Sequence, residues 1–307
     1  MNIILKVLPR FLRAIAVWPF APRRIEKPRL IMTLLVKNEA DKLEQNLLFH
    51  HEMGVDGFIV TDNNSSDSTP DILRRYKEKG WVLDIIDEPS TGYEQKLWVD
   101  RMVMMAIKKH RADWVINADA DELWFAPSGC LKTELSECRN RIMKCQSHCM
   151  MPEEDMPFTE WTQRVEPVDT LQQYDLSPYS IFQPQRGKVA HRATGYLHIA
   201  MGNHKVAMLP RTIAQGPIRI YHYSVGTRQV FIDKMVQGGR ELEKHSSKHG
   251  GRHWRYFYQL YKENRLSEEY DRVIGLPNRE RLIADGRLVE DTTIRDYFLK
   301  HNLKPCD

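Results

Sequence analysis

Three acidic side chains follow a short apolar segment near the middle of the chain. The apolar residues are Trp-Val-Ile at 114–116, and the acids are Asp119, Asp121 and Glu122. A short apolar run that ends in clustered charge is typical of a buried strand whose carboxyl end opens into a site. Ligands of open α/β sheets bind at that end of the strands.

The spacing of two of these acids suits a divalent cation. Asp119 and Asp121 are two residues apart, so an extended backbone would place both carboxylates on one face. They would repel each other there unless a positive charge lay between them. Carboxylate oxygens suit Mg²⁺ or Mn²⁺, which commonly share their coordination with substrate phosphates. The sequence therefore predicts a site for a metal ion and a diphosphate. The alternative is a solvated acidic turn after a strand.

A second polar segment also lies between a predicted strand and a predicted helix. Residues 61–69 read Thr-Asp-Asn-Asn-Ser-Ser-Asp-Ser-Thr. Asp62, Asn63 and Asn64 offer donors and acceptors suited to a base and a ribose. The serines that follow favour a turn and a helix N-cap. By itself the segment could equally be a plain strand–turn–helix junction.

Strands and helices alternate in the first part of the chain. The predicted strands are Leu30–Val36, Gly57–Thr61, Trp81–Ile86 and Trp114–Asn117, and the predicted helices are Glu39–Met53, Thr69–Lys79 and Glu94–Lys109. Alternation at such short spacings predicts βαβ units and a mainly parallel sheet. The acidic cluster then lies at the end of the fourth strand.

The second part of the chain is less regular. The predicted elements are strands at Ile142–Met151 and Ile218–Tyr223, short strands within Val189–Arg211, a loop at Met150–Asp169 and a helix at Phe231–Lys244. We therefore divide the chain into an N-terminal arm at 1–28, an α/β domain at 29–230 and a helical C-terminal region at 231–307.

The order of the motifs resembles a known family. Residues 35–39 read Leu-Val-Lys-Asn-Glu, the polar segment 61–69 follows, and 119–122 read Asp-Ala-Asp-Glu. This order resembles the glycosyltransferase family 2 type of GT-A domain over 30–125. Further residues look like its bacterial "Glyco_tranf_2_4" branch, namely Gln95, Trp98, Asp113–Ile116, Gly202–Lys205, His222, Tyr223, Arg228, Phe231 and Lys234.

The resemblance implies both a fold and a ligand. The fold would be an α/β GT-A domain, a Rossmann-like and mainly parallel sheet flanked by helices, with a helical C-terminal extension. A nucleotide sugar, a UDP sugar above all, would lie across the strand ends. The implied donor-binding residues are Lys37, Asn38, Glu39, Asp62, Asn64, Asp119 and His204. Asp121 would ligate Mn²⁺ or Mg²⁺, with Asp119 near the ribose or reaching the ion through water. His222 would be a third contact to the metal or the diphosphate.

The resemblance also implies an acceptor-activating base, because family 2 enzymes are generally inverting. The family's usual acidic signal on the acceptor loop is not clear in this chain. The nearest candidates are Glu153, Glu154 and Asp155, which follow the strand predicted at 142–151. Neighbouring acids can raise one another's pKa and so produce a usable base. The alternative is a solvated charge run in a loop.

The basic residues concentrate at the N-terminus. The net charge is +4, but residues 1–29 hold seven Lys or Arg and one acid, and the rest holds 38 basic and 40 acidic residues. A nearly neutral body argues against nucleic acid as a partner, because a binding patch should be folded and basic. The five cysteines are an odd number, which fits a reducing compartment such as the cytoplasm.

The N-terminal arm has two open interpretations. Leu5, Leu8, Leu12 and Ile15 follow a helical stripe within 1–22, and basic residues lie off it. Such a helix is typical of an anchor on an anionic membrane surface. It could equally pack on the body or on another subunit. The segment is too short and too charged to span a bilayer, and no cleavage site of a signal peptide follows.

The sequence thus predicts a metal-dependent glycosyltransferase that acts on a glycan or lipid-linked acceptor at the cytoplasmic membrane face, where bacterial surface polysaccharides are assembled. One alternative is a nucleotidyltransferase with the same acidic metal site, although residues 35–42 lack the Gly-rich, basic loop that it would need. The other is a non-catalytic scaffold that binds nucleotides or glycans. The Gly-x-x-x-x-Gly-Lys-Ser/Thr loop of P-loop proteins is absent.

Overall fold

The computed structural model describes residue 12 and residues 24–89, 95–244 and 251–305. The helix predicted within the arm at 1–22 therefore lies outside the described residues, apart from Leu12. None of the helices in the described part of the chain combines the length and hydropathy that crossing a bilayer requires.

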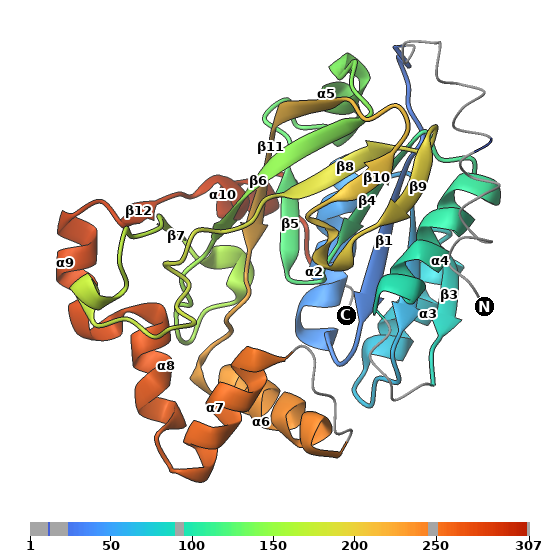
Figure 1. Ribbon diagram of the computed structural model, residues 1–307. Coiled ribbons are helices and arrows are strands. Elements are labelled where there is room, and N and C mark those ends of the chain that lie inside the picture. Colours follow the sequence, from blue (N-terminus) through green and yellow to red (C-terminus); the bar gives the residue numbers. More distant parts are fainter. Residues whose placement is uncertain (1–11, 13–23, 90–94, 245–250, 306–307) are drawn as a thin grey trace. The chain divides into compact units, whose positions relative to one another are not determined.

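An eight-stranded sheet forms the centre of the fold (Figure 1), with the strand order β3-β2-β1-β4-β8-β6-β11-β5. Its strands are β1 Leu30–Val36, β2 Gly57–Asp62, β3 Val82–Asp87, β4 Trp114–Ala118, β5 Glu122–Phe125, β6 Ile142–Cys149, β8 Lys188–Arg192 and β11 Ile213–His222. The first four are parallel, since β1 pairs in parallel with β2 and β4, and β2 with β3. Strand β8 pairs antiparallel with both β4 and β6.

Helices cover both faces of the parallel half of the sheet. They are α2 Ala40–Glu52, α3 Thr69–Glu78 and α4 Gln95–Lys108. Right-handed crossovers place α2 and α3 on one face, because both lead away from β1 towards β3. The crossover through α4 returns from β3 to β4 and must lie on the other face. Helix α4 contacts β1, β2 and β4 there, and Met102 packs with Ile31, Ile59 and Val115 in one apolar core.

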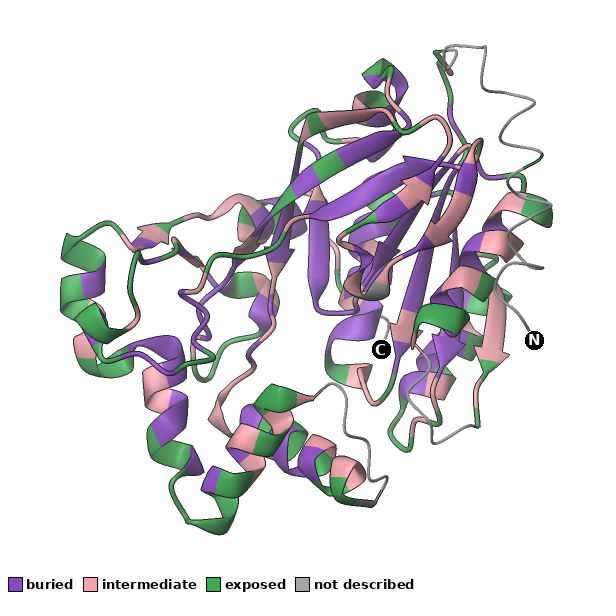
Figure 2. Cartoon of the chain, viewed as in Figure 1, coloured by how far each residue is buried: buried purple, intermediate pink, exposed green. Residues whose placement is uncertain are grey.

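The predicted α/β class, with helices flanking a central sheet, is confirmed. The sheet as a whole is mixed, because its parallel order ends at β4. A tight turn follows β4 in place of a crossover helix, so no further parallel strand is added on that side. The central strands are buried on both faces (Figure 2), as the uninterrupted apolar run of β1 predicts.

The remaining elements of the first compact unit are short. They are α5 Leu131–Glu137, β9 Tyr196–Ile199, the 3₁₀ turn Met201–Asn203 and β10 Val206–Met208. Strands β9 and β10 form a separate antiparallel pair. This unit consists of residues 1–147, 186–220 and 303–307.

A second compact unit consists of residues 148–185 and 221–302. Its elements are β7 Gln163–Val165, α6 Arg228–Lys244, α7 Arg252–Lys262, α8 Leu266–Ile274, α9 Arg279–Ala284, β12 Leu288–Glu290, α10 Thr293–Lys300 and 3₁₀ turns at Phe158–Glu160, Gln172–Tyr174 and Leu276–Asn278. It has its own apolar core around Phe182, Tyr270 and Leu282. The predicted loop 150–169 contains β7, which pairs with the distant β12.

Candidate functional site

The acidic residues close a tight turn between β4 and β5. We call Asp119–Glu122 the acidic turn. The Asp119 side chain is 40% exposed, whereas Asp121 and Glu122 are buried. The Glu122 backbone N–H donates to the Asp119 carbonyl at 3.2 Å. The Glu122 carboxylate accepts hydrogen bonds from the Asp119 backbone N–H at 3.3 Å and the Trp124 indole at 3.4 Å. Glu122 therefore holds the turn closed.

Helix α2 supports the acidic turn through hydrogen bonds from two of its side chains. The Asn46 amide Nδ2 donates to the carbonyls of Ala120 at 3.0 Å and Glu122 at 2.9 Å. His50 Nε2 accepts the Trp124 backbone N–H at 3.0 Å, so its Nδ1 carries the proton and donates to the Asn46 carbonyl at 2.9 Å. Burial lowers the pKa of His50 to about 3, which keeps the ring neutral.

A buried lysine supplies a positive charge between two of the acids. Lys188 Nζ lies 2.6 Å from Asp119 Oδ2 and 2.6 Å from Glu122 Oε1. The Lys188 side chain is only 5% exposed. Burial lowers the pKa of the ammonium, but the charges of Asp119 and Glu122 raise it more, so that the pKa lies above its ordinary value. Lys188 is therefore a permanent cation of this site.

The neighbouring strands fix the position of this lysine. Lys188 begins β8, which runs antiparallel beside β4. The Asn203 amide donates to the carbonyls of Val189, at 3.2 Å, and Asn117. The Thr33 hydroxyl of β1 donates to Asn117 Oδ1 at 2.8 Å. These contacts join the middle of β1 and the start of β8 to Asn117, near the end of β4 and two residues before the acidic turn.

The loops after β1 and β2 bind each other. Asn38 has a positive φ of 54°, which asparagine tolerates better than most residues. Its backbone N–H donates to Ser65 Oγ at 2.9 Å, and its Oδ1 accepts the Ser66 N–H at 2.7 Å. Asp62 Oδ1 accepts the Ser65 backbone N–H at 3.1 Å and hydroxyl at 2.6 Å. Asn38 and Asp62 are therefore held in fixed positions beside the strand ends.

The same two loops are joined again at the start of their helices. Asp67 accepts the backbone N–H groups of Ala40 at 3.1 Å and Thr69 at 2.9 Å. The Glu39 N–H donates to Thr69 Oγ1 at 3.0 Å. Burial raises the pKa of Asp67, but these hydrogen bonds outweigh it and leave the pKa below its ordinary value. Asp67 is thus a helix-capping residue.

These loops meet at one edge of the sheet. Strands β1, β2 and β4 are parallel, so their carboxyl ends share that edge. The crossovers change face between β1 and β4, and such a switch point is where open α/β sheets bind ligands. The predicted donor and metal residues at this edge are Lys37, Asn38, Glu39, Asp62, Asn64, Asp119 and Asp121. The structure brings them together, while their contacts to a ligand stay predictions.

His204 lies close to the acidic turn in the same unit. Its Nδ1 is 3.1 Å from the Gly187 carbonyl. Burial is the main cause that lowers the pKa of His204, and the charges of Lys188 and Asp119 also act on it. The implied role of His204 in donor binding stays a prediction.

The three candidate bases belong to the second unit. Glu153 accepts the Thr162 backbone N–H at 2.7 Å. Glu154 accepts the Arg228 N–H at the start of α6, at 3.1 Å. Asp155 is exposed and has a φ of 62°. Two of the three carboxylates therefore make structural hydrogen bonds within the second unit, and a role as base stays a prediction for all three.

His222 also belongs to the second unit. It ends β11, is half-buried, and its carbonyl accepts the Met150 N–H at 3.0 Å. Its role as a third metal or diphosphate contact stays a prediction.

The acidic turn suits an ion that arrives with phosphate ligands. In the described part of the chain, no group of three or more His, Cys, Asp or Glu side chains is arranged to hold a metal by itself. The three acids of the turn and Lys188 together carry a formal charge of −2. Mg²⁺ is often held by only one or two carboxylates, with water and substrate phosphates completing its shell. Asp119 and Asp121 fit that pattern.

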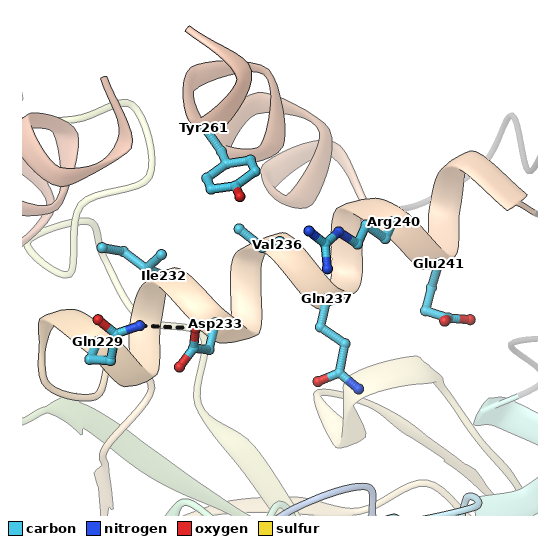
Figure 3. A pocket seen from close by; sticks show the side chains of 8 residues that line it. All are labelled: Gln229, Ile232, Asp233, Val236, Gln237, Arg240, Glu241 and Tyr261. Carbon is cyan, nitrogen blue, oxygen red and sulfur yellow. Dashed lines mark hydrogen bonds between the residues drawn. The ribbon is translucent and has the colours of Figure 1, made fainter. Parts of the chain in front are cut away.

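A separate cavity of about 620 Å³ lies along α6 in the second unit (Figure 3). It is lined by Gln229, Ile232, Asp233, Val236, Gln237, Arg240 and Glu241 of α6, and by Tyr261 of α7. The α6 residues recur every three or four positions and so form one face of the helix. None of the predicted site residues lines this cavity.

Comparisons with known proteins add little to this description. No family model and no curated protein matches the chain. A mannosyltransferase from Pyrobaculum calidifontis, solved with GDP-Man and Mn²⁺, is 15% identical with a TM-score of 0.42, covering 92% of this chain and 86% of that one. S. aureus TarS 1–349 is 11% identical with a TM-score of 0.37, and its UDP complex has 0.39, each covering 83% and 74%. These alignments define neither a family nor a function for this chain.

Several residues of the site carry no local sequence signal. Lys188 is 69 residues from Asp119, and Asn46 is 74 residues from Ala120. A lone lysine at the start of a short strand and an asparagine within a helix are common. Only the pairing of β8 with β4, and the packing of α2 under the turn, give these side chains their roles.

Proposed function

We propose that this chain is a metal-dependent, inverting glycosyltransferase that moves a hexosyl group from a nucleotide-diphosphate donor to an acceptor hydroxyl. A UDP sugar is the donor that the family 2 resemblance favours. One observation carries the proposal. Asp119 and Asp121 follow β4, beside the loop after β1, at the point of the sheet where the crossovers change face. A crevice at such a point is the common nucleotide site of open α/β folds.

The connection after β1 supports this function over nucleotidyl transfer. Strand β1 ends at Val36 and α2 begins at Ala40, so only three residues join them. This connection contains no glycine and is too short for a Gly-rich loop that wraps a triphosphate.

Transfer of the sugar develops negative charge on the leaving diphosphate oxygen. A bound Mn²⁺ or Mg²⁺ would act as a Lewis acid that neutralises this charge. Asp121 and Asp119 would hold the ion, and Asp62 would bind the base or ribose. Glu122 keeps the turn closed around them through its bonds to the Asp119 N–H and the Trp124 indole.

Inversion also requires a group that takes the proton of the acceptor hydroxyl as it attacks the anomeric carbon. We favour Asp155 among the three candidates. Glu153 and Glu154 already accept backbone N–H groups, which protonation of either carboxylate would weaken. Asp155 is exposed, as Glu154 is. The acceptor in this proposal is a glycan or a lipid-linked glycan of bacterial surface polysaccharide synthesis. The basic arm at 1–22 would hold the protein at the cytoplasmic face of the membrane.

The test is donor hydrolysis across a panel of nucleotide sugars, with Mn²⁺, with Mg²⁺ and with EDTA. We expect slow, metal-dependent release of a nucleoside diphosphate from one donor. Asp121→Ala should lower this rate by about 10²–10³-fold, because it removes a group that stabilises the developing charge. The control is Asp71→Ala, which alters an exposed acid in the first turn of α3.

The other outcomes separate the alternatives. Release of pyrophosphate from nucleoside triphosphates would identify a nucleotidyltransferase. Tight donor binding without hydrolysis or transfer would identify a non-catalytic scaffold. Full activity of Asp121→Ala would exclude its proposed metal role.

A further inference from the structure

Lys188 is a charged group of the site that the proposed chemistry does not use. Its ammonium contacts Asp119 Oδ2 and Glu122 Oε1 at the same distance, 2.6 Å. Glu122 is fully buried, and Asp119 is 40% exposed. Lys188 therefore pairs with two carboxylates at once: Glu122, which is buried, and Asp119, which would face the proposed ligand.

A divalent ion on Asp119 would lie close to this ammonium. Carboxylate oxygens bind Mg²⁺ at about 2.1 Å, so the ion and the Lys188 nitrogen would be separated by roughly 5 Å. Two positive groups at that separation repel each other, and the burial of Lys188 limits how far water can screen the repulsion. Lys188 cannot easily move away, because Glu122 has 0% exposure and would lose its counter-charge.

A diphosphate would remove this conflict. It brings at least two negative charges, which can lie against the ion and the ammonium together. The ion and the diphosphate should then each raise the affinity of the protein for the other, and by the same factor.

We propose that Lys188 is an internal competitor of the divalent ion for Asp119, which makes ion binding depend on the nucleoside diphosphate. The inference rests on the proposed function, because it takes the acidic turn as the metal site. Free protein then holds Mn²⁺ weakly, and the ion enters together with the nucleotide. Lys188 is a positioning residue in this scheme: it holds Asp119 and Glu122 and sets the order in which ligands bind.

The experiment measures Mn²⁺ affinity by calorimetry and by the paramagnetic resonance of free Mn²⁺, with and without saturating UDP. For the wild-type chain we expect UDP to tighten Mn²⁺ binding by at least about ten-fold. Equal affinities with and without UDP, in a chain shown to bind UDP, would overturn the proposal without any variant.

Substitution of Lys188 separates a competing charge from a purely structural role, because the two predict opposite changes in Mn²⁺ affinity. Lys188→Met should bind Mn²⁺ at least about ten-fold more tightly than wild type in the absence of UDP, because the competing charge is gone. A lysine that served only to hold the fold together would, when removed, leave a looser turn and weaker Mn²⁺ binding. Lys188→Arg keeps the charge and should resemble wild type.

Two further variants complete the test. Lys188→Met with Glu122→Gln removes the carboxylate that the single change leaves buried without its counter-charge, and should also bind Mn²⁺ more tightly. Lys144→Met changes an exposed lysine on the neighbouring strand β6 and should have no effect. Weaker or unchanged Mn²⁺ binding in folded Lys188→Met and in the double variant would overturn the proposal.

Failure of this inference is distinguishable from failure of the proposed function. Metal-dependent donor hydrolysis with UDP-independent Mn²⁺ affinity would leave the function standing and reject the role of Lys188. Absence of any UDP binding or donor hydrolysis would reject the function, and the ion affinities of the free proteins would still decide whether Lys188 competes for Asp119.

Discussion

Asp119, Asp121 and Glu122 have different surroundings, although they lie within four residues of one another. Glu122 is a structural residue, since it is fully buried and bonds Lys188, the Trp124 indole and the turn's own backbone. Asp119 is shared between Lys188 and the exposed side of the turn. Asp121 is buried, and it is the acid of the turn that we propose as the main metal ligand. The Asp-x-Asp-Glu pattern therefore contains one proposed metal ligand, one carboxylate paired with Lys188 and one structural residue.

Two buried histidines predict how stability depends on pH. Burial lowers the pKa of His50 to about 3 and that of His191 to about 4. Both rings are neutral in the folded chain at pH values where an unfolded chain, with a histidine pKa near 6.5, is protonated. The unfolded state then binds more protons, so the free energy of unfolding rises with pH between about 4 and 6.5. Each histidine should contribute about 1 kcal/mol per pH unit within that window.

Urea unfolding at several pH values between 4.5 and 7.5 checks this expectation. His50→Gln and His191→Gln should each reduce the slope by about one proton. The control is His301→Gln, which changes a partly exposed histidine after α10. An unchanged slope in both buried variants would show that other groups control acid stability.

At the scale of elements, short connections decide where the polar side chains lie. Three residues join β1 to α2, and the loop after β2 bonds to them through Ser65 and Ser66. Strand β8 supplies the cation of the site, because it places Lys188 beside the end of β4. The site is thus built by the carboxyl ends of the parallel strands β1, β2 and β4 and by the first residue of the antiparallel strand β8.

The predicted membrane binding of the N-terminal arm can be tested separately from the catalytic site. Residues 1–22 should bind anionic vesicles, because each Lys or Arg near such a surface adds about 1 kcal/mol. Sedimentation with phosphatidylglycerol vesicles should remove the full chain from solution, and deletion of 1–22 should leave it there. Binding should weaken with added salt. Vesicles of phosphatidylcholine are the control. Equal sedimentation of both proteins would favour an arm that packs on the body or on another subunit.

At the scale of the whole molecule, two compact units interleave along the chain. The loops after β1, β2 and β4, together with Lys188 and His204, all belong to the first unit. The second unit has a separate apolar core that includes Phe182. The donor chemistry proposed here therefore depends on the first unit, and the candidate bases and His222 belong to the second.

This division predicts that a core substitution in the second unit lowers stability without changing UDP affinity. Phe182 is fully buried, and Phe182→Ala should lower the free energy of unfolding by about 3–5 kcal/mol through the cavity that it leaves. UDP affinity, measured by calorimetry well below the melting temperature, should stay within about two-fold of wild type. Phe58→Ala, an equally buried change in β2, should reduce both stability and UDP affinity. Loss of UDP binding in folded Phe182→Ala would show that the second unit shapes the donor site.

The sequence by itself determined the parallel half of the fold and the strand-end position of the acids. Its predicted first strand has the bounds observed for β1, and the three helices between strands agree within one residue or two at each end. The reason is that hydrophobic periodicity and turn residues are local signals, which act over ten to fifteen neighbouring residues. Asp62 ends the buried strand β2, and Asp121 lies three residues after the buried strand β4, both close to where the apolar runs of the sequence stop.

Only the tertiary structure decided which charge faces the acidic turn. Lys188 reaches Asp119 and Glu122 because β8 pairs antiparallel with β4, and Asn46 and His50 reach the turn because α2 packs under it. These contacts join residues 66 to 76 positions apart. Such pairings depend on strand order and helix placement, to which the whole chain contributes, so no single segment carries a signal for them. The sequence predicted a metal ion between Asp119 and Asp121, whereas the lysine that the fold brings to the turn pairs with Asp119 and Glu122.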